Sequence, residues 1–155
     1  MAGEVEIDGF LPRVFGMKRA ELLRAARYFA RRSAARSGLD FRAVTVVLQD
    51  DAASAEAHLA INGAEGPTDA ITQPYDPMPG EAPGVYGEVY VNCDRALRAA
   101  PKRRGWSPAR ELLLYIAHGM DHLSGADDFE SADYARMRRR ELGWIADFAR
   151  CRDVV

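Results

Sequence analysis

Residues 111–128 have the sequence ELLLYIAHGMDHLSGADD, an apolar run followed by two histidines, a glycine and two aspartates. The length and composition of the run predict a helix. On a helix His118 and His122, four residues apart, project from the same face one turn apart. Two imidazoles at this spacing reach one divalent metal ion without distortion of the backbone. Gly125 tolerates the positive φ with which helices commonly end, so we expect the chain to turn back there.

The two aspartates after this turn offer a third metal ligand. The sequence leaves open whether Asp127 or Asp128 reaches back to the histidines, because a turn is predicted only to within one position. Two histidines and one carboxylate leave an open coordination position for water, as in catalytic zinc sites. The alternative is a pair of solvated or hydrogen-bonded histidines near a helix end. The chain has only three histidines, and because two of them lie in this pattern, it favours metal binding.

The residue after the first histidine bears on the class of metal enzyme. Proteases that bind zinc through two histidines of one helix carry a glutamate at this position as general base. Here the position is Gly119, which has no side chain, and the neighbouring Asp121 has a shorter reach than glutamate. A protease-like, zinc-dependent metallohydrolase is therefore the weaker interpretation.

The same stretch resembles the signature His-Gly-x-x-His-Leu-x-Gly-x-Asp-His of the YbeY family, whose members are metal-dependent endoribonucleases of ribosomal RNA maturation and ribosome quality control. Three further blocks follow the family's order along the chain. Residues 67–72 (PTDAIT) are similar to its Pro-Thr-Asp block, residues 87–91 (GEVYV) to its Gly-Asp-Ile block, and Met137 with Glu141 to its closing helix. The resemblance covers most of the chain from residue 43 onward.

The resemblance implies a metal site made by His118, His122 and Asp128, with Asp128 in place of the family's third histidine. One zinc ion per chain is the expected cofactor, and another divalent metal is the alternative. RNA is the expected partner, as ribosomal RNA or the small ribosomal subunit. The family often has a loop arginine implicated in RNA cleavage, and residues 61–66 contain none. A non-catalytic, ribosome-associated metal-binding factor is therefore a further alternative.

The expected reaction is metal-assisted cleavage of phosphodiester bonds. Asp121 and Asp127 are the candidate general bases, unless the metal activates water without one. Arg103 and Arg104 lie just before the metal helix and are the candidate phosphate-binding residues. Other arginines cluster at residues 19–36 and 136–140, where they form either solvated faces or phosphate-contacting surfaces.

Composition bounds the class of protein. At 155 residues, with 48% hydrophobic and 28% charged residues, the chain predicts one globular domain over residues 1–155. The net charge of −2 gives no overall basic field. Two scattered cysteines favour a reduced, intracellular protein. Since no apolar run reaches the length of a signal or membrane segment, we expect a cytoplasmic protein without a membrane partner. Nothing in the sequence indicates the oligomeric state.

The expected architecture is an α+β domain with a small mixed sheet of about four strands packed with helices, and the metal site lies at the end of a core helix. This detail depends more on the resemblance than on periodicity. Apolar periodicity and turn residues predict the elements. The expected helices are 17–37, 52–61, 95–100, the metal helix from Pro108, and 130–149; the expected strands lie near 5–7 and at 43–48, 68–72 and 87–92; residues 74–84 form a loop.

Overall fold

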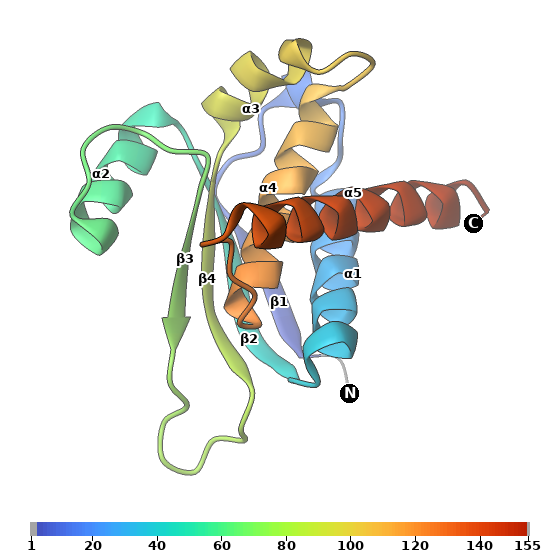
Figure 1. Cartoon of the computed structure of the whole chain (residues 1–155). Coiled ribbons are helices and arrows are strands. Elements are labelled where there is room, and N and C mark those ends of the chain that lie inside the picture. The colour runs from blue at the N-terminus through green and yellow to red at the C-terminus, as the bar shows by residue number, and fades with distance from the viewer. Residues whose placement is uncertain (1–2, 155) are drawn as a thin grey trace.

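The apolar helix that carries the two histidines, α4 (Pro108–Leu123), lies at the centre of the structure (Figure 1). The structure is a computed structural model that describes residues 3–154, with side chains as far as Cys151. The remaining elements are β1 (Glu4–Asp8), α1 (Arg19–Ser37), β2 (Phe41–Gln49), α2 (Asp51–Asn62), β3 (Ala70–Tyr75), β4 (Val85–Asn92), α3 (Cys93–Ala99) and α5 (Ser131–Val154), with short 3-10 helices at Arg13–Phe15 and Ala100–Lys102.

The four strands form one mixed sheet in the order β1-β2-β4-β3. Strand β2 is parallel to both β1 and β4, whereas β3 is antiparallel to β4. Helices α1 and α4 cover one face of this sheet, and α5 crosses α4 and α1 on the side away from the strands (Figure 1). The single domain, the α+β class and the mixed four-stranded sheet expected from the sequence are confirmed.

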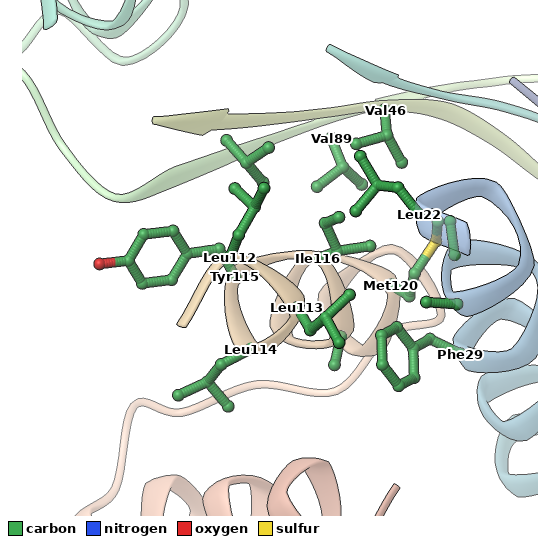
Figure 2. Packing of buried hydrophobic residues seen from close by; sticks show 14 of the residues in the cluster. Leu22, Phe29, Val46, Val89, Leu112, Leu113, Leu114, Tyr115, Ile116 and Met120 are labelled. Atoms are coloured by element: carbon green, nitrogen blue, oxygen red, sulfur yellow. The ribbon is translucent and has the colours of Figure 1, made fainter. Parts of the chain in front are cut away.

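Helix α4 is buried on nearly every side because the sheet, α1 and α5 surround it. Figure 2 shows Ile116 and Met120 of α4 between Val46 and Val89 of the sheet and Phe29 of α1. All five of these residues are fully buried, with 0% relative exposure. Burial of a side chain of this size contributes roughly 1.5–3 kcal/mol, so the apolar run is the main source of stability in this part of the chain.

Local sequence signals determine where the helices begin and end. Ser107 caps α4 by accepting a hydrogen bond from the amide of Arg110, and Pro108 takes the first helical position. Helix α1 ends at Gly38, whose φ of 76° is the left-handed conformation that glycine adopts without strain. Asp50 caps α2 through the amide of Ala53.

The observed elements agree with the sequence predictions, with differences only at the ends. Helix α5 extends beyond the predicted residue 149, to Val154. Cys93 is buried and Cys151 is exposed, and both are free thiols. Burial raises the pKa of the Cys93 thiol to about 11, so this thiol stays protonated at neutral pH. Within residues 3–154, no helix combines the length and the apolar character needed to cross a bilayer.

Candidate metal centre

The two histidines of the pattern meet at the C-terminal end of α4. The Nε2 atoms of His118 and His122 lie 3.0 Å apart, and the two rings are nearly perpendicular, at 86°. Both side chains are largely buried but keep 20% and 25% of their surface accessible. As the spacing of four residues predicts, both imidazoles project from the same face of α4. They face one point that solvent can still reach.

The opposite nitrogen of each ring is held by a hydrogen-bond acceptor. His122 Nδ1 lies 2.9 Å from the carbonyl oxygen of Ala126, and His118 Nδ1 lies 2.9 and 3.1 Å from the two carboxylate oxygens of Glu141. A carbonyl oxygen only accepts, so Nδ1 of His122 carries the proton, and the carboxylate of Glu141 assigns the same tautomer to His118. In the neutral rings, each Nε2 then presents a lone pair.

Asp128 brings a carboxylate to the same point. Its Oδ2 atom lies 3.6 Å from Nε2 of His122 and 3.9 Å from Nε2 of His118. The chain reaches this position through a turn at Gly125, where φ is 97°. Ligand atoms of the three side chains all lie within 4.8 Å of one another, whereas Asp127 is exposed and outside this group. The geometry therefore favours Asp128 over Asp127 as the third donor.

This donor set fits a small divalent cation. Two nitrogen lone pairs that face each other at 3.0 Å beside a carboxylate repel one another unless a positive charge lies between them. Two imidazole nitrogens bound tetrahedrally to zinc at 2.0–2.1 Å would lie roughly 3.3 Å apart, close to the observed separation. Because the three side chains are only partly buried, a further position on such an ion would stay open to water or substrate.

Glu141 tunes the electrostatics of the histidine that it contacts. Burial lowers the pKa of His118, but the hydrogen bond and the negative charge of Glu141 outweigh it, and the net pKa is raised. The Glu141 side chain has no exposed surface, and burial raises its pKa, with His118 opposing this shift. A buried carboxylate behind a metal-facing imidazole fixes the ring orientation and increases the basicity of the other nitrogen.

Gly119, the residue after the first histidine, faces the sheet. A Cβ atom at this position would lie 2.3 Å from Cγ1 of Val89, so the close approach of α4 to β4 requires glycine. A glutamate there would point into the core, away from the histidines. The packing therefore removes the general base of a zinc protease and argues against the protease-like alternative.

Asp121 lies in a buried ion-pair network, apart from the histidine nitrogens. One carboxylate oxygen accepts hydrogen bonds from Nη2 and Nε of Arg140, at 2.7 and 3.2 Å. The other oxygen lies at ion-pair distance, 3.1 Å, from Nε of Arg36, without the geometry of a hydrogen bond. Since its side chain is 0% exposed, Asp121 is not accessible to water or to a substrate. We therefore do not assign it the role of general base.

Arg103 and Arg104 lie at the opposite end of α4 from the histidines. They precede the first residue of this helix, and His118 is ten residues, or about 15 Å, further along its axis. Arg103 is held there by Glu111, at 3.2 Å, and by the ring of Trp106. The prediction that these arginines bind phosphate at the metal centre is therefore not supported, because proximity in sequence was taken as proximity in space.

The 67–72 block is fixed to the sheet beside α4. The carbonyl oxygen of Thr68 accepts hydrogen bonds from Ser54 and from the buried amide of Asn92, at 3.0 and 3.1 Å. Thr68 N donates back to Ser54 Oγ at 3.0 Å. The adjacent Asp69 is near enough to His118 for its negative charge to help raise the pKa of this histidine. The block thus adds a further negative charge to the surroundings of His118.

Two other sequence features belong elsewhere. Glu88 accepts a hydrogen bond from the hydroxyl of Tyr75, on the sheet face opposite to Val89 and α4, so it does not support the histidines. His58, the third histidine, lies 2.8 Å from the carbonyl oxygen of Gly66 and holds the turn after α2. Sequence reasoning missed the contact between Glu141 and His118, for which the only signal was the resemblance of the closing helix.

Comparisons with known proteins give one consistent family. The sequence matches the family model described as Endoribonuclease YbeY over residues 17–149. A protein from Micrococcus luteus named Endoribonuclease YbeY is 42% identical over 122 residues, which cover 75% of this chain and 74% of that protein. A protein of the same name from Rhodopirellula baltica is 36% identical over 111 residues, which cover 71% of this chain and 56% of that protein.

A solved structure has a similar fold. It is the solution structure of a protein from Thermotoga maritima, which matches this structure with a TM-score of 0.61 and 24% sequence identity. The match covers 94% of this chain and 89% of that chain. At this level of identity, the likeness concerns the fold and nothing further.

Proposed function

Because this chain belongs to the YbeY endoribonuclease family, we propose that it is a metal-dependent endoribonuclease acting in ribosomal RNA maturation and ribosome quality control. The proposed ligands of the metal, a single zinc ion, are His118, His122 and Asp128. The proposed partner is ribosomal RNA, alone or in the small ribosomal subunit. The family is metal-dependent and cleaves RNA. The zinc ion, its three ligands and the ribosomal RNA partner are proposed here for this chain.

The observation that carries the proposal is the convergence of two imidazole lone pairs and one carboxylate at a point accessible to solvent. When bound there, zinc would polarise a phosphoryl oxygen and acidify a water molecule. The chain's own part is to hold His118 and His122 in one tautomer, through Glu141 and the carbonyl oxygen of Ala126. Because these contacts exist in the folded chain, the donors are already oriented before a metal or a substrate arrives.

Asp127 remains the candidate general base. It is exposed, adjacent to Asp128, and makes no ion pair with any residue in the described part of the chain. A carboxylate in this position would accept a proton from water at the centre. Asp121, the other candidate from the sequence, is excluded from this role in our proposal by its burial between two arginines.

The experiment compares metal content and RNA cleavage in the wild type, D128A and D127A. We expect near-stoichiometric zinc by elemental analysis in the wild type and in D127A, and a sharp loss in D128A. In single-turnover assays on ribosomal RNA fragments, D128A loses cleavage with its metal. D127A keeps its metal but cleaves about 10²–10⁴ times more slowly if Asp127 is the base.

Each alternative has its own signature in this experiment. Loss of zinc in D127A and not in D128A would make Asp127 the ligand. Wild-type protein that holds zinc and binds ribosomal RNA without cleaving it would be the non-catalytic metal-binding factor. A wild type that neither carries nor binds a divalent metal contradicts the proposed function.

A further inference from the structure

The N-terminal half of α5 carries three polar side chains in one row, and the row ends at the metal centre. Tyr134, Arg138 and Glu141 follow one another at intervals of four and three residues, so they share one face of the helix. Glu141, at the end of this row, contacts His118 directly. Arg138 therefore lies one turn from a residue that contacts His118. Arg103 and Arg104, in contrast, lie at the far end of α4 from the histidines.

The guanidinium group of Arg138 is held in place by Tyr134. Its Nη2 atom donates a hydrogen bond of 3.0 Å to the Tyr134 hydroxyl, and its Cζ atom lies 5.4 Å from the centroid of the Tyr134 ring. Arg138 is half-buried, whereas 45% of Tyr134 is exposed. A guanidinium fixed by a ring and a hydroxyl loses less conformational freedom when it binds a ligand.

The charge of Arg138 is not compensated by a carboxylate. On the same helix, Arg136 pairs with Asp133, Arg140 with Asp121, and Arg150 with Asp147. Arg138 makes no ion pair with a carboxylate anywhere in the described residues, and its positive charge opposes the net rise in the pKa of both His118 and Glu141. A guanidinium without a carboxylate partner beside a site for a divalent cation is electrostatically costly unless an anion also binds there.

We propose that Arg138 binds a phosphate oxygen of the RNA substrate at the metal centre, and that Tyr134 is a positioning residue that orients its guanidinium group. A planar guanidinium presents two parallel N–H donors that match two phosphate oxygens. The proposal rests on the proposed function, and it assigns the phosphate-binding role to α5 in place of residues 103–104 before α4.

The test compares R138A with R150A, which removes the same charge from the same helix. Arg150 is twelve residues, or about 18 Å, from Arg138 along the axis and is paired with Asp147. The first measurement is the binding of zinc-loaded protein to a short, labelled, single-stranded 2′-O-methyl RNA, by fluorescence anisotropy over a range of salt concentrations. We expect R138A to bind about 10–100 times more weakly, as for the loss of a charged hydrogen-bonded pair. Its slope of log affinity against log salt decreases by about 0.7, and R150A behaves as the wild type.

The second measurement is single-turnover cleavage of unmodified RNA, with zinc content measured for each variant. R138A and R138Q cleave at least about tenfold more slowly at unchanged zinc content, and R138K recovers only part of the rate because it lacks the planar fork. Y134F weakens oligonucleotide binding in the wild-type background. It has no further effect in the R138A background, a coupling that general structural damage would not produce.

The outcomes separate this inference from the proposed function. If the wild type binds the oligonucleotide in an Arg138-dependent manner but cleaves no RNA, the nuclease proposal fails and the phosphate site stands. If the wild type cleaves RNA while R138A and R138Q bind and cleave as R150A does, the inference is wrong and the proposed function stands. Absence of oligonucleotide binding by the wild type also contradicts the inference.

Discussion

At the scale of single residues, the centre depends on contacts to the nitrogens that face away from it. The sequence motif places the two rings, but Glu141 and the carbonyl oxygen of Ala126 determine which nitrogen of each ring carries the proton. Glu141 lies 23 residues from His118 in sequence, on another helix. A carboxylate that orients an imidazole in this way fixes the ring and raises the basicity of the nitrogen that faces the metal.

The substitution E141Q tests this role. It keeps the shape of the side chain but removes its charge, and we expect the zinc affinity to fall about 10–100-fold, measured by competition with a chromogenic chelator. Protons compete with zinc for neutral His118, and Glu141 raises the pKa of this histidine. Zinc affinity should therefore begin to fall at a higher pH in the wild type than in E141Q as the pH is lowered. The exposed Glu130 gives the control, E130Q, and equal affinity in E141Q and wild type would exclude the role.

At the scale of elements, the contact between α4 and β4 determines how the histidines are presented. Gly119 lies against Val89, and Gly87 of the same strand lies under Leu123 near the end of α4. Added Cβ atoms at the two glycines would lie 2.3 Å from Val89 and 2.9 Å from Leu123. The helix therefore packs closely on the strand through two glycines, and this close packing sets the position of α4, which carries His118 and His122.

The substitution G119A is expected to destabilise the protein despite the higher helix propensity of alanine. Alanine gains up to about 1 kcal/mol over glycine within a helix, whereas overpacking of a tight core contact costs about 1–3 kcal/mol. In urea denaturation, the free energy of unfolding should therefore fall in G119A and recover in part when V89A is added. Gly143 in α5 has open space at the same point, so G143A should be neutral or stabilising. A G119A protein as stable as G143A would refute the close contact.

At the scale of the whole molecule, one buried carboxylate connects three helices. Asp121 of α4 contacts Arg36 of α1 and Arg140 of α5, and Arg36 also donates a hydrogen bond of 2.7 Å to Ser124 in the turn that leads to Asp128. Figure 1 shows α1 and α4 side by side, with α5 crossing both. This network therefore joins the packing of the domain to the position of the third donor.

Removal of the Asp121 charge should affect folding and not the chemical step. The variant D121N leaves two arginines without their partner, and breaking a buried pair costs about 3–5 kcal/mol. We expect the lower end of this range, because the side chains of Arg36 and Arg140 keep 29% and 25% of their surface exposed. Chemical denaturation measures the loss, and D127A serves as an exposed control. A D121N protein with wild-type stability but greatly reduced cleavage would instead identify Asp121 as the general base.

The sequence by itself determined the elements of the fold and the pair of histidines. Alternation, helical periodicity and capping residues act between neighbours in the chain, so α4, its end near Gly125 and the common face of His118 and His122 could be predicted from residues within a few turns. The family resemblance added the mixed sheet and its order of elements. The end of α5 was predicted less accurately, because element ends depend on single contacts.

Only the tertiary structure decided which other side chains share the centre. Asp121 is next to His122 in sequence and yet lies in a buried ion-pair network, whereas Glu141 is distant in sequence and contacts His118. For the same reason, Arg103, which is close to α4 in sequence, lies at the far end of this helix from the histidines, whereas Arg138 lies one turn from Glu141. The burial of α4 against the sheet, α1 and α5 sets which face of each helix meets the histidines, and this depends on contacts between segments far apart in the chain.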